Sequence, residues 1–153
     1  MHGGPAAGYG GAMTQLTTDA FIDLLQGDLS SEYQSIVQYT QHIAVLTGPE
    51  YLSTADELKV HVKQEVDHAG VLAEQISFLG GVPGTSVPEV TPASDSKEAL
   101  LDDLSLETQQ LERYRERVIQ ATELGLVDVA EALRPLLTQT QEHVRDLQAA
   151  LGE

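Results

Sequence analysis

Glutamates and histidines recur along this 153-residue chain at spacings that place them on one face of long helices. The set comprises Glu32, Glu65, His68, Glu107 and His143. Carboxylate oxygens and imidazole nitrogens together suit iron, manganese and zinc. An ionised carboxylate inside an apolar helix interface is costly unless a cation or another partner offsets its charge. The pattern therefore predicts a buried metal site.

The arrangement occurs twice along the chain, with an offset of 75 residues (107 − 32 = 143 − 68 = 75). The matched pairs are Glu32 and Glu107, Ile36 and Leu111, Tyr39 and Tyr114, His68 and His143, and Leu72 and Leu147. Glu65 has Thr140 as its equivalent, which is the one mismatch in the set. Two similar helical hairpins, related by an approximate two-fold axis, would bring both halves of the set to one point.

Four long helical segments position these residues. Each carries apolar residues at alternating steps of three and four, which is typical of a helix packed into a bundle. Thr18 is the expected N-cap of the first segment, and glycines or a Gly-Pro pair end the first three. The expected ranges are about 18–46, 52–79, 96–124 (starting at 94 at the earliest) and 127–151.

The connections predict how the helices are arranged. Short joints after the first and third helices favour antiparallel hairpins, whereas the Pro- and Gly-rich stretch from Gly80 to about Pro92 can cross the length of a bundle. The expected fold is all-α, a four-helix bundle with a long crossover between the second and third helices. Pro135 should kink the fourth helix or disturb its hydrogen bonds. The glycine-rich residues 1–13 are expected to form a disordered tail, with the bundle in 14–153.

Composition excludes several classes of function. The chain has no cysteine, which rules out disulfides, thiolate metal sites and thiol catalysis. Asp and Glu number 24 against 8 Lys and Arg, a formal charge of −16, so nucleic acid and anionic membranes are disfavoured as partners and cations are attracted. No run approaches the roughly 18 apolar residues of a membrane span. Without a signal-peptide pattern, a cytoplasmic location is expected.

The full spacing set resembles that of the ferritin-like di-iron carboxylate family, most closely the bacterioferritins. In that family two helices each supply one Glu and two others each supply Glu-x-x-His. The matching stretches are EYQSIVQY at 32–39, EVDHAGVLAEQISFLGGVP at 65–83 and DLSLE at 103–107, and the resemblance covers about residues 20–150. It implies a ferritin-like bundle in which Glu32, Glu65 and His68 hold one metal. Glu65, Glu107 and His143 would hold the other.

Thr140 departs from the family pattern, because a glutamate is expected three residues before His143. Glu142 lies about 100° around the helix from His143 and is no simple substitute. Gln139 could reach inward, but only with an uncharged amide oxygen. By resemblance, the missing carboxylate is one that bridges the metals, and three glutamates leave one positive charge beside two divalent ions. Binding is expected to be weaker on the His143 side, with one or two ions per chain.

Two further departures concern haem and assembly. By resemblance, the haem-binding methionine of bacterioferritins corresponds to Val66, so no haem is expected. The chain ends ten residues after His143, without the short fifth helix that helps to close a bacterioferritin cage. A homo-oligomer is expected, and a dimer packed through the first two helices is favoured at least as much as a cage.

Three other residues on the same helix faces have competing interpretations. His61, one turn before Glu65, could be an extra ligand or the partner of a ligand, but a hydrogen-bonded core histidine is favoured. Tyr39 and Tyr114 are interpreted as core aromatics with hydrogen-bonded hydroxyls. The resemblance alone suggests a catalytic role for Tyr39, as an electron donor near the metal.

Three functions follow as hypotheses. The leading one is ferroxidase-type oxidation of Fe(II) by oxygen or peroxide at a dinuclear site, with iron as the expected metal and manganese or zinc as alternatives. The second is a non-catalytic scaffold that binds a single metal for structure or sequestration, which Thr140 favours. The third is a peroxide-reducing enzyme like the rubrerythrins, although the chain lacks the cysteines of a rubredoxin-type centre. DNA protection of the miniferritin kind is disfavoured by the negative charge.

Overall fold

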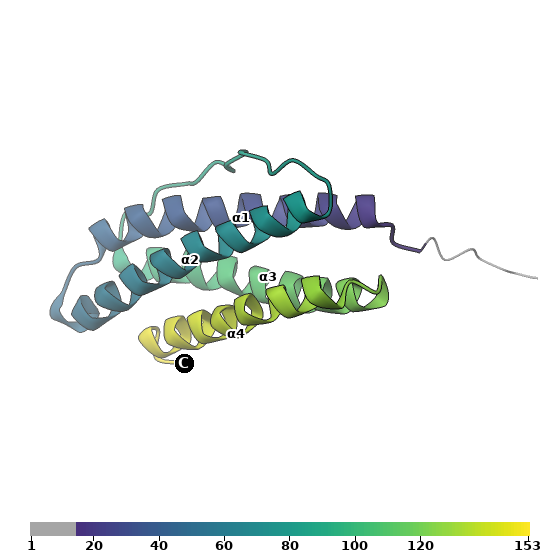
Figure 1. Cartoon of the computed structure of the whole chain (residues 1–153). Coiled ribbons are helices and arrows are strands. Elements are labelled where there is room, and N and C mark those ends of the chain that lie inside the picture. The colour runs from purple at the N-terminus through teal and green to yellow at the C-terminus, as the bar shows by residue number, and fades with distance from the viewer. Residues whose placement is uncertain (1–14) are drawn as a thin grey trace, which may run out of the picture.

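The structure is a computed structural model that describes residues 15–153, so the expected tail at 1–13 lies outside the described residues. Four long helices lie side by side (Figure 1). They are α1 (Thr18–Val45), α2 (Leu52–Phe78), α3 (Ser96–Glu123) and α4 (Val127–Ala150), and a short 3-10 helix, η1 (Pro49–Tyr51), precedes α2. Residues 15–153 contain no strand. The expectation of an all-α four-helix bundle is confirmed.

Side-chain caps set where α1 and α3 begin. Thr17, not Thr18 as expected, caps α1, because its hydroxyl accepts a hydrogen bond of 3.1 Å from the amide of Ala20. Such a cap must lie just before the first helical residue, and Thr18 is already helical. Asp95 caps α3 in the same way, with 2.9 Å to the amide of Glu98.

The crossover between α2 and α3, residues 79–95, returns along α1 to the opposite end of the bundle (Figure 1). Consequently α2 and α3 run in the same direction, and the expected long crossover is confirmed. Two glutamines of α1 hold this segment, and the side-chain amide of each both donates and accepts a hydrogen bond. Gln26 donates to the Val82 carbonyl at 2.7 Å and accepts from the Gly84 amide at 2.8 Å. Gln41 does both with the backbone of Ala93, at 2.9 and 3.0 Å.

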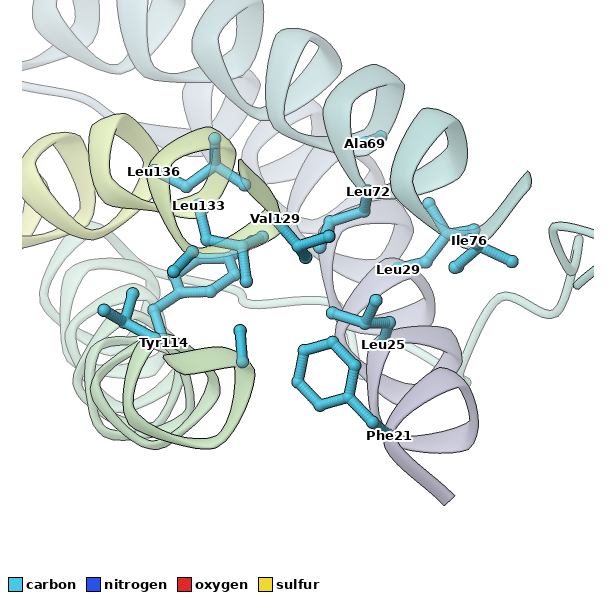
Figure 2. Packing of buried hydrophobic residues seen from close by; sticks show 13 residues of the cluster. Phe21, Leu25, Leu29, Ala69, Leu72, Ile76, Tyr114, Val129, Leu133 and Leu136 are labelled. Atoms are coloured by element: carbon cyan, nitrogen blue, oxygen red, sulfur yellow. The ribbon is translucent and has the colours of Figure 1, made fainter. Parts of the chain in front are cut away.

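The apolar core is divided into two clusters along the bundle. Figure 2 shows the larger one, in which residues of all four helices point toward one another. Its buried members are Phe21, Leu25, Leu29, Ala69, Leu72, Ile76, Tyr114, Val118, Ala121, Val129, Ala130, Leu133 and Leu136. The smaller cluster comprises Tyr39, Leu58, Leu100 and Leu147. Along each helix, the polar residues with metal-binding groups lie between the two clusters.

The fourth helix continues without interruption from Val127 to Ala150, with Pro135 inside it. Pro135 is exposed, so the carbonyl that lacks an amide partner can bond to water instead. None of the helices in residues 15–153 combines the length and the hydropathy that a bilayer crossing requires.

Candidate metal centre

Five buried side chains with metal-binding groups meet midway along the bundle, between the two apolar clusters. Each of them is at most 1% exposed: Glu32 from α1, Glu65 and His68 from α2, Glu107 from α3, and His143 from α4. They come together because each lies on the inward stripe of its helix, where residues three or four positions apart share a face.

Glu65 lies at the centre of this cluster, with one carboxylate oxygen toward each histidine. Its Oε2 is 3.2 Å from Nδ1 of His68, and its Oε1 is 2.9 Å from Nδ1 of His143. Glu32 approaches His68 at 3.7 Å, and Glu107 approaches His143 at 3.3 Å. The arrangement therefore consists of two similar halves that share Glu65.

Two groups of three residues offer ligand atoms that all lie within 4.8 Å of one another. The first is Glu32, Glu65 and His68, and the second is Glu65, Glu107 and His143. Glu32 Oε2, Glu65 Oε1 and Nδ1 of both histidines are buried without a hydrogen-bond partner. Buried polar atoms are rarely left without partners, because that arrangement is costly. These lone pairs fit a bound cation.

The pKa values show how the centre balances its charges with protons. Burial, followed by the charges of Glu32 and Glu107, raises the pKa of Glu65 well above its ordinary value. Burial opposes the ionisation of Glu107 too, but hydrogen bonding and charge at His143 outweigh it, and the pKa falls to about 2. Burial likewise lowers the pKa of His68, but Glu32 outweighs it and the net shift is upward. Cation uptake would displace such protons.

Two glutamines hold the histidine rings from behind. Nε2 of His68 donates to Gln139 Oε1 at 2.7 Å, and Nε2 of His143 donates to Gln64 Oε1 at 2.6 Å. Because Nε2 donates to the glutamine, Nδ1 is the nitrogen that faces the carboxylates, and it can bind a metal once any proton on it is displaced, as in ligands with an outer hydrogen-bond partner. Gln139 thus supports the imidazole of His68 from the outside and is not one of the possible ligands. Sequence analysis missed Gln64, although it lies 75 positions before Gln139.

The two buried tyrosines each donate a hydrogen bond to a glutamate of the opposite half. The Tyr39 hydroxyl is 2.7 Å from Glu107 Oε1, and the Tyr114 hydroxyl bonds to Glu32 Oε1. Burial, reinforced by the neighbouring carboxylates, raises the pKa of both phenols well above 10. Both tyrosines therefore stay protonated and act as donors that fix the carboxylate orientations.

Thr140 occupies the inward position where the two-fold repeat would have a second shared glutamate. Its side chain is fully buried, and its hydroxyl donates to the Leu136 carbonyl at 2.7 Å. Thr140 belongs to neither group of possible ligands. Glu142 is exposed on the outside of α4, so it does not replace the missing carboxylate.

His61 is a third buried imidazole beside the cluster, only 2% exposed. Its Nε2 is 3.0 Å from Asp146 Oδ2, and its ring stacks on that of His143 with 4.0 Å between centroids. Burial, followed by the charge of His143, lowers the pKa of His61. The hydrogen bond agrees with the favoured interpretation of a paired core histidine. The sequence gives no sign of the pairing with Asp146, because residues 85 positions apart meet only once the helices are packed.

Buried polar pairs flank the centre between α1 and α3. Asp28 accepts from Arg117 at 2.8 Å, and Asp103 pairs with His42 at 2.7 Å. These pairs obey the same 75-residue offset (28 + 75 = 103; 42 + 75 = 117). Sequence analysis missed them, because one buried aspartate gives no sign of its partner until the helices are packed.

The chain is similar to known proteins over most of its length. Residues 22–153 match the family model of the ferritin-like domain. A bacterioferritin from Mycobacterium leprae is 24% identical over 132 residues, which cover 86% of this chain and 83% of the relative. A nutrient stress-induced DNA-binding protein from Nostoc is 24% identical over 130 residues, covering 78% of this chain and 71% of the relative.

Two solved structures have closely similar backbones. A ferritin-like diiron-carboxylate protein from Bacillus anthracis superposes with a TM-score of 0.82 and 28% identity, covering 88% of this chain and 96% of the other. A dodecameric thioferritin from Bacteroides fragilis, described as bacterioferritin-related, has a TM-score of 0.81 and 26% identity. That comparison covers 90% of this chain and 88% of the other.

Proposed function

Because the chain belongs to the ferritin-like domain family, we propose that its buried centre binds iron and oxidises Fe(II) with oxygen or peroxide. One observation carries the proposal: two groups of carboxylates and an imidazole share Glu65 between them. A shared carboxylate can hold two metal ions close together, and paired ions can each give one electron to the same oxidant.

Each of the two groups of ligands would hold one ion. Glu32 and His68 would hold one ion, Glu107 and His143 the other, and Glu65 would bind both. Two Fe(II) ions become two Fe(III) ions, and the two electrons with two protons convert O2 to H2O2. With peroxide as the oxidant, the same electrons and protons convert H2O2 to two water molecules. Manganese and zinc suit the same ligands, so the identity of the metal is part of the proposal.

Residues around the ligands orient them and hold protons. Gln64 and Gln139 keep the Nε2 protons of the two histidines in place, so that each Nδ1 is free to bind metal. We assign Tyr39 a role beside the His143 ion, as the donor of an electron, because its hydroxyl bonds to Glu107. Tyr114 has the same position relative to Glu32 in the other half.

Oxygen consumption with added Fe(II) tests the proposed activity. The unmodified chain should consume oxygen, and Glu65→Ala combined with His68→Ala should abolish the uptake, because that change removes the shared carboxylate and one imidazole. Glu142→Ala is a matched control, since Glu142 is an exposed glutamate of α4 outside both groups. Equal uptake by the unmodified chain and the double variant would reject the ferroxidase proposal.

A non-catalytic scaffold that binds a single metal is the second candidate, and Thr140 favours it. With three glutamates, two divalent ions leave one positive charge in a buried site, so the second ion should bind more weakly. Titration of the metal-free protein should then give one tight and one weak ion per chain. Thr140→Glu should tighten the weak one by supplying the fourth carboxylate, whereas two equally tight ions in the unmodified chain would contradict this prediction.

We also propose that the chain assembles into a homo-oligomer and does not bind nucleic acid. The Bacteroides relative is described as dodecameric and the Nostoc relative as DNA-binding. The formal charge of −16 opposes contact with a phosphate backbone. The same charge favours cations over anionic partners.

A further inference from the structure

Three imidazoles form a row along the seam between α2 and α4. His143 lies in the middle, with the His61 ring stacked on it at 4.0 Å and 25° between ring planes. His68 lies on the other side, at 6.0 Å between centroids and 23° between planes. The proposed metal ligands account for two members of this imidazole row, and His61 remains without a role.

Each ring in the imidazole row bonds through Nε2 to a side-chain oxygen on the opposite helix. The pairs are His68 with Gln139, His143 with Gln64, and His61 with Asp146. His61 lies seven residues before His68 on α2, and Asp146 lies seven residues after Gln139 on α4. Seven residues make nearly two helical turns, so His61 lies on the same face of α2 as His68, two turns away. Both histidines therefore face α4.

The Nδ1 atoms of all three rings are buried and lack a hydrogen-bond partner. For His68 and His143, this atom is the one that faces the carboxylates. His61 has the same combination of a bound Nε2 and a free Nδ1. A carboxylate on Nε2 is the usual outer partner of a metal-binding histidine, since it fixes the tautomer and makes Nδ1 more basic.

The two halves of the centre differ in a complementary way. The two-fold equivalent of His61 is Leu136 (61 + 75 = 136), which has no ligand atom. The equivalent of the shared Glu65 is Thr140, which also supplies no carboxylate. The extra imidazole therefore lies against the His143 ring, on the side where the loss of a carboxylate was expected to weaken binding.

We propose that His61 Nδ1 is an additional ligand of the ion held by Glu65, Glu107 and His143, in place of the carboxylate that Thr140 does not supply. The proposal rests on the metal site of the proposed function and adds a residue to it. His61 belongs to neither group of mutually close ligand atoms, so its side chain must move for Nδ1 to reach the ion. Asp146 acts as a positioning residue that orients the ring.

Cobalt(II) bound to the full-length protein is a suitable probe, because it takes the same ligands and shifts the proton NMR signals of histidines bound to it. A histidine bound through Nδ1 keeps an exchangeable Nε2 proton, so each such ligand gives one strongly shifted, exchangeable signal. Three signals are expected, and His61→Leu should remove one of them. Two signals, with none lost in His61→Leu, would overturn the proposal.

Titration gives an independent measurement of the same ligand. His61→Leu should weaken the second Co(II) ion at least about tenfold, the lower end of what loss of a supporting residue costs a metal site. Adding Thr140→Glu to His61→Leu should restore the affinity, because the carboxylate then replaces the imidazole. His42→Gln is the matched control, since His42 is buried beside Asp103 and has a free Nε2 but does not stack on the imidazole row. An unchanged second affinity in His61→Leu would overturn the proposal.

The outcomes separate this inference from the proposed function. If the unmodified chain binds no metal, the metal centre itself is rejected. If it binds two ions with only two histidine signals, the centre stands and the role of His61 is rejected. Should His61→Leu fail to fold, His61→Gln replaces it in both experiments, because the amide can keep the hydrogen bond to Asp146 while the imidazole signal must still disappear.

Discussion

At the scale of single residues, the centre depends on the protonation of Glu65. This carboxyl group is 1% exposed, lies near Glu32 and Glu107, and has a raised pKa for those reasons. Its two oxygens approach both His68 and His143. A proton on Glu65 and a metal ion beside it are therefore alternative ways to offset the same negative charge.

The stability of the metal-free protein should consequently depend on pH. A carboxyl group with a raised folded pKa contributes stability that is complete below its ordinary value of 4.5 and is lost as pH rises through the folded pKa. The raised pKa of His68 acts in the same direction above 6.5. We expect the free energy of unfolding in urea to fall as the pH rises above about 4.5, and further above about 6.5.

Glu65→Gln is the control for this prediction, because the amide cannot titrate and the slope should become smaller. The lowered pKa of Glu107 contributes only below 4.5, where its stabilisation is lost as pH falls toward about 2. It should not affect the measured range. The same slope in the unmodified chain and in Glu65→Gln would show that another group causes the dependence.

At the scale of elements, the two helical hairpins follow one plan but differ in their buried polar pairs. Arg117 of α3 bonds to Asp28 of α1, whereas the equivalent pair joins Asp103 of α3 to His42 of α1. All four side chains are at most 4% exposed. Arginine stays charged, whereas burial raises the pKa of Asp28 to about 6 although Arg117 lowers it, so the two form an ion pair across the interface between α1 and α3 above that pH.

Arg117→Met should therefore destabilise the bundle by about 3 kcal/mol, because it leaves the Asp28 carboxylate buried without its main partner. The value is at the lower end of the usual range, since Arg113 remains 3.6 Å from Asp28. Arg115→Met is the matched control on α3, where Arg115 pairs with Glu112 at the surface, and it should change stability by less than about 0.5 kcal/mol. Urea unfolding measures both, and equal losses would contradict the prediction.

At the scale of the whole molecule, large exposed apolar side chains are more numerous on α1, α2 and the crossover than on α3 and α4. Most of the large exposed hydrophobic residues in the described part belong to α1, α2 and the crossover, namely Val37, Leu52, Val60, Val66, Phe78, Val82 and Val87. Only Leu101, Ile119 and Val127 belong to α3 and α4. Contact between copies through α1 and α2, the dimer expected from the sequence, would cover several of these side chains.

The dimer expected through α1 and α2 can be tested by a single charge on α1. Val37→Glu should reduce the mass in solution, measured by light scattering during gel filtration, because it buries a carboxylate in the interface between copies. Ile119→Glu introduces the same charge on α3 and should leave a dimer intact. If the unmodified chain is already a monomer, the oligomer proposal is wrong; if both variants dissociate it, the interface extends beyond α1 and α2.

The amino-acid sequence determined which residues face inward, because that depends only on the period of each helix. The four helices and the burial of Glu32, Glu65, His68, Glu107 and His143 follow from this period and from the 75-residue offset, and the crossover follows from the long Pro- and Gly-rich segment after α2. Their role as metal ligands remains a prediction, since burial and convergence are geometry and not binding.

Only the tertiary structure decided which side chains meet across helices. The bonds of Gln64 to His143, Asp146 to His61 and Tyr39 to Glu107 join residues that lie 68 to 85 positions apart. The axial shift and rotation between packed helices set such pairs, together with the rotamers that the packing allows. A single helix contains none of that information, so the periodicity identified the inward residues but not their partners.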